Sequence, residues 1–130
     1  MGDPVARAQA LLGLPVTGQG RVHAVRRVDA AGGAYQLVCV DGRLACLEVP
    51  GGRLLASADS AVDPVALTAQ QARARAGLGA AAAARLVWAP SAATRSMFDP
   101  VWEVAVPGRT LYVDQRGAVW PALAPAPMQG

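Results

Sequence analysis

The sequence contains no lysine, no isoleucine and no asparagine, so all 12 of its basic residues are arginines. Together with abundant alanine and glycine, this bias is typical of a GC-rich genome rather than of a particular chemistry. The arginines are scattered, and only Arg26 and Arg27 are adjacent. A nucleic-acid site needs clustered cations interleaved with stacking aromatic side chains. We therefore expect no nucleic-acid partner, and the net charge of +3 favours acidic partners only weakly.

Histidine and cysteine are also scarce: His23 is the one histidine, and Cys39 and Cys46 are the two cysteines. A zinc site made by the protein alone would need carboxylates as well. No serine or cysteine lies in a nucleophile-elbow motif, and no phosphate-binding glycine loop is present. His23 is therefore interpreted as a solvated histidine on a strand. We expect no enzymatic activity, no metal and no cofactor.

The chain also lacks a long hydrophobic run, since no segment approaches the ~18 apolar residues of a membrane-spanning helix. Residues 1–4 lead directly into a helical pattern, without the charged and apolar regions of a signal peptide. Two interpretations remain open: a cytosolic protein, or a protein from which a signal or membrane anchor has been removed. The apolar fraction of 53% excludes general disorder.

The clearest positive feature is an internal repeat with a period of 66 residues. At this offset Ala6–Ala8 aligns with Ala72–Ala74, and the Gly42-Arg43 turn aligns with Gly108-Arg109. In both halves a helix ends in glycine, a strand pair turns at Gly-Arg, and a second turn carries glycine. Self-similarity at a fixed period is typical of duplicated structural units.

Each copy is expected to begin with a helix. Asp3-Pro4 is a start signal for the first helix, while Asp63-Pro64 and a capping box of Thr68 and Gln71 compete as starts of the second. Strands follow each helix. The sequence predicts two hairpins, with the strand pairs Tyr35–Val40 and Leu44–Val49, and Val101–Val106 and Thr110–Asp114.

These features predict an α+β fold class, with two repeated units that each pack one helix on a three- or four-stranded antiparallel sheet. The first unit is expected over residues 3–60 and the second over 63–122. A flexible, proline-rich tail is expected over 123–130. In the second unit, Trp102 is expected to face the helix and Glu103 to lie on the outer face of the sheet.

The second half carries a short motif at its closing hairpin. Leu111-Tyr112-Val113-Asp114 is followed by Gly117-Ala118-Val119, and Thr68 opens the preceding helix. Over about residues 65–122 this pattern resembles the PepSY domain, in which the aspartate and the glycine shape the turn between the last two strands. The first half departs from the pattern, because the places of Tyr112, Val113 and Asp114 are occupied by Cys46, Leu47 and Glu48.

The resemblance implies a helix packed on an antiparallel sheet and a location outside the cytoplasm. PepSY-like units are attached to peptidase propeptides or occur alone, and they have been proposed to inhibit or regulate peptidases. A tandem of such units is similar in architecture to the β-lactamase inhibitor protein. We therefore expect a non-enzymatic, extracytoplasmic module that binds a protein partner, such as a peptidase or an envelope protein, as a monomer or homodimer. The alternative is a cytosolic domain that binds a small molecule on its sheet face.

Cys39 and Cys46 flank the predicted turn at Gly42. If the loop runs from Asp41 to Leu44, the two cysteines are direct cross-strand neighbours, about 5 Å apart at Cβ. If the turn is only Asp41-Gly42, they are diagonal neighbours on one face. The sequence thus admits a disulfide worth on the order of 2 kcal/mol, or two small buried hydrophobic side chains.

A binding site for the protein partner is predicted at the two Gly-Arg turns. Arg43 and Arg109 occupy equivalent repeat positions, and Tyr112 and Trp120 lie nearby on the closing hairpin. Guanidinium groups suit the carboxylates of an acidic partner, and aromatic rings supply rigid contact area. The alternative is that arginine follows glycine by chance in an arginine-rich chain.

Overall fold

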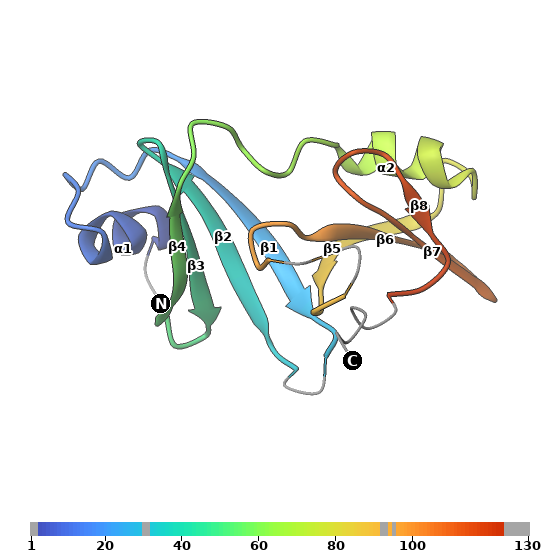
Figure 1. The fold of residues 1–130 in the computed structure, drawn as a ribbon, viewed down its shortest axis with the longest axis horizontal. Helices are drawn as coiled ribbons and strands as arrows, with labels where there is room; N and C mark the ends of the chain where they lie inside the picture. Colours follow the sequence, from blue (N-terminus) through green and yellow to red (C-terminus); the bar gives the residue numbers. More distant parts are fainter. Residues whose placement is uncertain (1–2, 30–31, 92–93, 95, 124–130) are drawn as a thin grey trace, which may run out of the picture.

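A computed structural model describes residues 3–29, 32–91, 94 and 96–123, which form one twisted sheet with a short helix towards each end (Figure 1). Across the sheet the strand order is β4-β3-β2-β1-β5-β6-β7-β8. The elements are α1 (Pro4–Leu11), β1 (Arg21–Arg27), β2 (Ala34–Val40), β3 (Arg43–Val49), β4 (Leu54–Asp59), α2 (Ala69–Ala76), β5 (Ala83–Trp88), β6 (Val101–Val106), β7 (Arg109–Val113) and β8 (Val119–Trp120). Residues 124–130 of the predicted tail lie outside the described residues.

The two halves of the chain meet at the centre of the sheet. There β1 and β5 run parallel, through the residue pairs Arg26–Val87 and Arg27–Trp88. The other neighbouring strands pair antiparallel over the described residues. The sheet is therefore mixed, with β4 at one edge and β8 at the other.

The predicted fold class is wrong. We expected two units with separate antiparallel sheets, whereas the described strands form one eight-stranded mixed sheet with two helices of eight residues each. A helix followed by four strands does occur twice along the chain, but the pairing of β1 with β5 merges both halves. The physical reason lies at the strand edges, because separate sheets would leave the backbone N–H and C=O groups of β1 and β5 unpaired.

Both helices begin where side chains cap their free amides. Asp3 Oδ1 accepts from the Val5 amide at 3.0 Å. Of the two starts predicted for the second helix, the structure has the capping box: Thr68 is the N-cap and Gln71 completes it. The same helix ends at Gly77, whose φ of 69° favours glycine.

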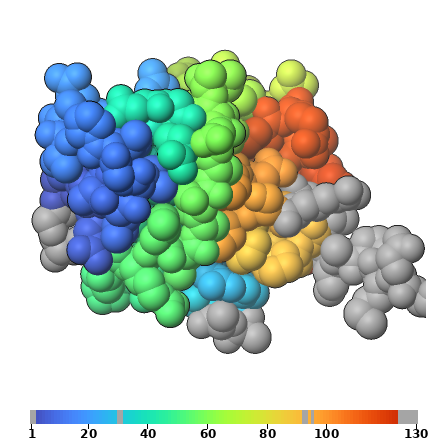
Figure 2. Space-filling model, turned by 60° about the vertical axis from the view of Figure 1, so that its left-hand side comes forward, coloured from blue at the N-terminus to red at the C-terminus, as the bar shows by residue number. Residues whose placement is uncertain are grey.

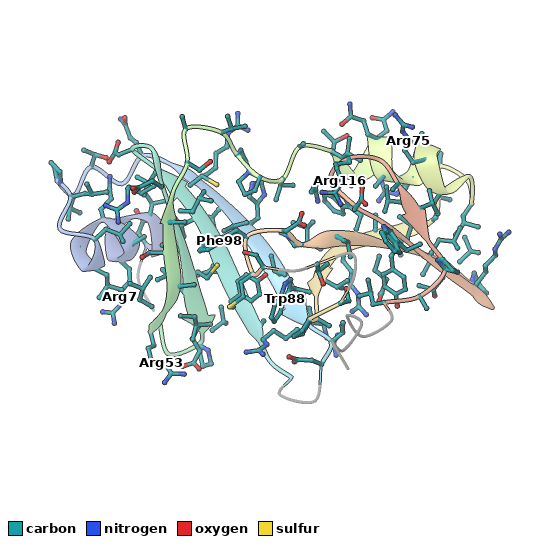
Figure 3. All side chains as sticks on the ribbon, viewed as in Figure 1. Arg7, Arg53, Arg75, Trp88, Phe98 and Arg116 are labelled. Carbon is teal, nitrogen blue, oxygen red and sulfur yellow. The ribbon has the colours of Figure 1, made fainter. Side chains whose placement is uncertain are left out.

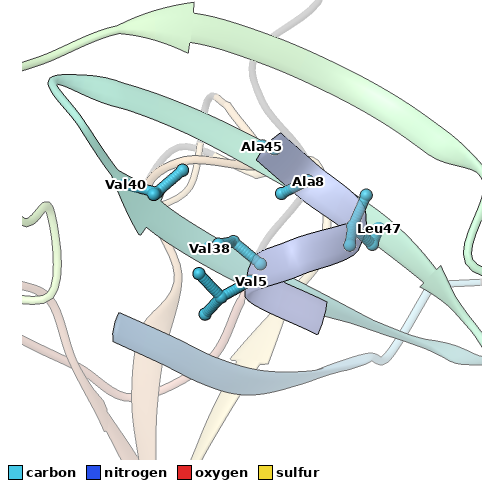
Figure 4. Packing of buried hydrophobic residues seen from close by; sticks show 6 residues of the cluster. All are labelled: Val5, Ala8, Val38, Val40, Ala45 and Leu47. Atoms are coloured by element: carbon cyan, nitrogen blue, oxygen red, sulfur yellow. The ribbon is translucent and has the colours of Figure 1, made fainter. Parts of the chain in front are cut away.

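The helices cover opposite faces of the sheet. α1 packs on the face formed by Val38, Val40, Ala45 and Leu47 (Figure 4), which we name the α1 face. α2 packs through Ala72 on the other side, which we name the α2 face. Figure 2 brings the α1 end forward and shows α1 in dark blue beside β4 in green. Because side chains alternate along a strand, the register assigns every strand residue to one of these faces.

The α2 face holds the central core. Tyr35 is fully buried, donates from its hydroxyl to the Met97 carbonyl oxygen at 2.7 Å, and meets the Trp88 ring edge-on at a centroid distance of 6.3 Å. Trp88 and Phe98 lie in the middle of the molecule, between the two helices (Figure 3). Trp102 faces α2, as predicted, and its Nε1 donates to the Leu67 carbonyl oxygen at 2.9 Å. This core therefore joins residues of both halves.

Candidate functional site

On the α1 face, beyond α1 itself, four side chains lie directly opposite one another on adjacent strands. The register pairs Arg85 with Glu103, Glu103 with Tyr112, and Tyr112 with Trp120. We call these four residues the cross-strand row. Directly opposed residues have Cβ atoms about 4.5–5.5 Å apart, so the row forms a continuous strip across β5, β6, β7 and β8. Glu103 had been expected on this outer face.

The charged end of the row is an ion pair. Arg85 Nε donates to Glu103 Oε1 at 2.8 Å, with the two side chains 51% and 15% exposed. Burial raises the pKa of Tyr112, and the neighbouring Glu103 carboxylate raises it further. The phenol therefore keeps its proton at neutral pH and stays a hydrogen-bond donor.

The aromatic end of the row is fixed by a buried carboxylate. Trp120 Nε1 donates to Asp114 Oδ2 at 3.0 Å, while Asp114 Oδ1 accepts from the amides of Arg116 and Ala118 at 2.9 and 3.0 Å. Burial alone would raise the pKa of Asp114, but the hydrogen bonds from Trp120 and these amides outweigh it and lower the pKa. The turn thus holds the indole ring in one orientation.

A shallow hollow of about 330 Å³ lies beside the row, lined by Ala24, Arg26, Ala34, Arg85 and neighbouring residues. Arg26 and Arg85 are both exposed and stand at the hollow on the α1 face. Among the described residues, no ion pair involves Arg26. The hollow is therefore flanked by two guanidinium groups.

The structure does not bring the two predicted turn arginines together. Arg43 Nε lies 2.6 Å from Asp59 Oδ1, near the β4 edge. Arg109 opens β7, and five strand spacings, roughly 24 Å in total, separate β3 from β7. Arg109 also pairs with Val106, which packs under α2, so Arg109 lies on the face opposite Tyr112. Of the four predicted residues, only Tyr112 and Trp120 are neighbours.

The hairpin between β2 and β3 has the two-residue turn. Cys39 lies opposite Leu44 and Cys46 opposite Leu37, so the cysteines are diagonal neighbours on the α2 face. Both are free thiols. Diagonal neighbours are about 7–8 Å apart, beyond the usual Cα separation of a disulfide. Burial raises the pKa of each thiol to about 12.

His23 belongs to a cluster that the sequence did not indicate. Its Nε2 lies 2.8 Å from Asp63 Oδ2, and the ligand atoms of His23, Cys39 and Asp63 all lie within 4.8 Å of one another. The His23 side chain is 22% exposed, so it is not the solvated histidine that we expected. Asp63 follows β4, 40 residues along the chain from His23, and only the folded sheet places them together.

The chain matches no protein-family model, no curated protein and no solved structure. No helix among the described residues is long and apolar enough to cross a membrane. A fold on its own does not define a function, so the function has to be argued from the site.

Proposed function

We propose that the protein is a non-enzymatic protein-binding module that docks an acidic segment of its partner on the α1 face over β5 to β8. The observation that carries the proposal is the cross-strand row. It combines an arginine, two aromatic rings and a rigid sheet, and tyrosine, tryptophan and arginine are the residues enriched at binding hot spots. The residues of the cross-strand row lie on strands whose backbone is already ordered before the partner binds, and this order lowers the entropic cost of binding.

The positive charge at this surface favours an acidic partner. Arg26 and Arg85 flank the hollow, and Glu103 neutralises one of the two guanidinium groups. The Arg85 side chain keeps half of its surface exposed, so its remaining N–H groups can reach a carboxylate. A segment rich in aspartate or glutamate would therefore place one acidic side chain at the hollow and lie across the rings of Tyr112 and Trp120.

The location and the class of partner rest on the resemblance of residues 65–122 to the PepSY domain. On that basis we infer a location outside the cytoplasm and a peptidase or envelope protein as the partner. Fractionation of the source cells with an antibody to the protein tests the location. Recovery in the cytosol alone would contradict it.

The binding proposal is tested by affinity capture followed by measured affinities. The immobilised protein is exposed to separate envelope and cytosolic extracts, and the captured protein is identified and purified. We expect Tyr112→Ala to weaken its binding at least tenfold and Arg85→Ala severalfold, with Arg109→Ala as the matched arginine control on the opposite face. Equal affinities for the wild type and for Tyr112→Ala, with circular dichroism unchanged, would contradict the proposal.

The hollow also favours a second candidate, a small-molecule site on the sheet face. Its volume of about 330 Å³ lies at the low end of ligand pockets, which span about 300–1,000 Å³. Amide shifts confined to Ala24 and Ala34 on addition of small anionic fragments would support this candidate. Shifts that extend to Tyr112 on addition of a glutamate-rich peptide would support protein binding instead.

A further inference from the structure

Three chemically different ligand groups converge on the α2 face. His23 comes from β1 and Cys39 from β2. His23 lies opposite Leu37, and Cys39 is two residues after Leu37 in β2, so its side chain lies on the same face. Asp63 comes from the segment that runs from β4 to α2 across the top of the sheet (Figure 1). An imidazole nitrogen, a thiol sulfur and a carboxylate oxygen thus lie within 4.8 Å of one another.

We propose that His23, Cys39 and Asp63 bind one zinc ion, with a water molecule as the fourth ligand. Zinc takes nitrogen, sulfur and oxygen ligands in a tetrahedral arrangement at about 2.0–2.3 Å, which puts neighbouring ligand atoms roughly 3.3–3.8 Å apart. The hydrogen bond from His23 Nε2 to Asp63 Oδ2 is 2.8 Å long, so these two groups need to separate by less than about 1 Å. A thiolate ligand disfavours calcium and magnesium, which prefer oxygen.

The surroundings of the cluster hold the ligands and leave room for the water. Asp63 Oδ1 accepts from the Val65 amide at 2.9 Å, which orients the carboxylate and leaves Oδ2 for the metal. The side chains of His23 and Asp63 are 22% and 16% exposed. A cavity of about 500 Å³, lined by Cys39, Asp63 and Ser60 among others, opens beside them.

Binding at this cluster balances charge and releases a proton. A Cys39 thiolate and the Asp63 carboxylate together neutralise a divalent ion, while His23 coordinates as the neutral imidazole. The thiol proton passes to the solvent. Without a cation the thiol stays protonated, because burial and the facing Asp63 carboxylate raise its pKa to about 12; a metal reverses this preference.

One neighbouring cation competes with the metal. Arg21 Nη1 lies 3.6 Å from Asp63 Oδ2, on a side chain that is 77% exposed. The guanidinium can therefore swing into solvent when the metal enters. Arg21→Ala is expected to tighten metal binding severalfold, whereas weaker or unchanged binding would contradict Oδ2 as a ligand.

The test is a titration of the chelator-treated, tag-free chain with Co²⁺, followed by displacement with Zn²⁺. We expect one equivalent of Co²⁺ to bind, with a thiolate-to-cobalt charge-transfer band and visible bands of tetrahedral intensity. Cys39→Ala should abolish the charge-transfer band, while Cys46→Ala, the matched cysteine on the same face, should keep it. His23→Gln and Asp63→Asn should each weaken binding at least tenfold.

The outcomes separate this inference from the protein-binding proposal, because the cluster and the cross-strand row lie on opposite faces of the sheet. Circular dichroism of each variant checks that it folds, and Zn²⁺ should raise the melting temperature of the wild type but not of Cys39→Ala. Three outcomes would overturn the metal site. The charge-transfer band could persist in Cys39→Ala, it could disappear in folded Cys46→Ala, or the folded wild type could bind no metal.

Discussion

The two halves of the sheet close their last turns in different ways. In the second half, the buried carboxylate of Asp114 accepts from two backbone amides and from Trp120. In the first half, Glu48 lies at the equivalent position, near the end of β3, but its side chain is 41% exposed and pairs with Arg53 at 3.1 Å. Backbone hydrogen bonds occur in both turns. In the first they run from the Glu48 amide to the Arg53 carbonyl oxygen and from the Gly52 amide to the Glu48 carbonyl oxygen, and in the second Asp114 makes two corresponding bonds, so the difference lies in the side-chain contacts. The same strand order therefore does not require the same turn chemistry.

The two halves also differ in which face their helix covers. The parallel strands β1 and β5 lie side by side, and their meanders extend in opposite directions across the sheet. Such halves are related by a half-turn about the strand direction, which exchanges the two faces. α1 and α2 consequently cover opposite faces, and the face of each half that carries no helix has different chemistry. The first half presents the His23 cluster on the α2 face, and the second presents the cross-strand row on the α1 face.

The largest expected effect tests whether the two halves unfold together. Tyr35→Ala removes a fully buried ring from the core that both halves share, so we expect a loss of about 3–5 kcal/mol in the free energy of unfolding. All three tryptophans lie in the second half, whereas Tyr35 lies in the first. Tryptophan fluorescence and far-ultraviolet circular dichroism should therefore report the same shifted denaturation midpoint.

Tyr35→Phe is the control for this experiment. It keeps the ring and loses only the hydrogen bond to Met97, so we expect a loss of about 1 kcal/mol. A fluorescence midpoint that stays at the wild-type value in Tyr35→Ala, while the dichroism midpoint falls, would show that the halves unfold independently.

The contrast between the two turns predicts the next largest effect. Asp114 is 1% exposed, and Asp114→Asn puts an NH₂ donor in the place of one of its two acceptor oxygens. We therefore expect the free energy of unfolding to fall by about 2–3 kcal/mol. Glu48→Gln changes an exposed side chain and is expected to cost no more than about 0.5 kcal/mol. Urea denaturation of both variants measures the difference. Equal losses would mean that the buried carboxylate is not what holds the second turn.

The same carboxylate predicts a pH dependence. The pKa of Asp114 in the folded protein lies below its ordinary value of 3.8, because its hydrogen bonds outweigh burial. Such a group stabilises the fold above its unfolded-state pKa, and that contribution is lost as the pH falls through the folded-state pKa. The difference in unfolding free energy between the wild type and Asp114→Asn should therefore shrink between pH 5 and pH 3, the acid range about the ordinary aspartate pKa. A difference that stays constant with pH would contradict this assignment.

Local features of the fold could be predicted from the sequence. The strand expected at Tyr35–Val40 occurs as Ala34–Val40. The structure also has the predicted turn at Gly42 and one of the two predicted helix starts, the cap at Thr68. These features depend on alternation, turn residues and capping over a few positions. The pairing of β1 with β5 depends on which strand edges meet in space, and no local pattern encodes that.

The candidate sites show the same limit. Tyr112 and Trp120 were identified because they share one hairpin, but Arg85 joins them only through the β5–β6 register. His23 and Asp63 are separated by 40 residues and meet because the segment after β4 crosses the α2 face. The repeat offset of 66 residues holds for β3 and β7, which start at Arg43 and Arg109. It does not hold for β1 and β5, which start at Arg21 and Ala83, only 62 residues apart. Register and insertions therefore decide which side chains converge.

The smallest expected effect concerns the two turn arginines, and it separates the turns from the cross-strand row. Arg43 pairs with Asp59, whose side chain is 84% exposed, and Arg109 is itself exposed. Exposed pairs contribute little, so Arg43→Ala combined with Arg109→Ala should change the free energy of unfolding by no more than about 0.5 kcal/mol. Because these arginines lie several strands apart and Arg109 lies on the face opposite Tyr112, the double variant should also bind the captured partner as tightly as the wild type does. Thermal denaturation and the affinity measurement check both expectations on one preparation. Severalfold weaker binding with an unchanged melting temperature would move the partner surface from the cross-strand row to the turns.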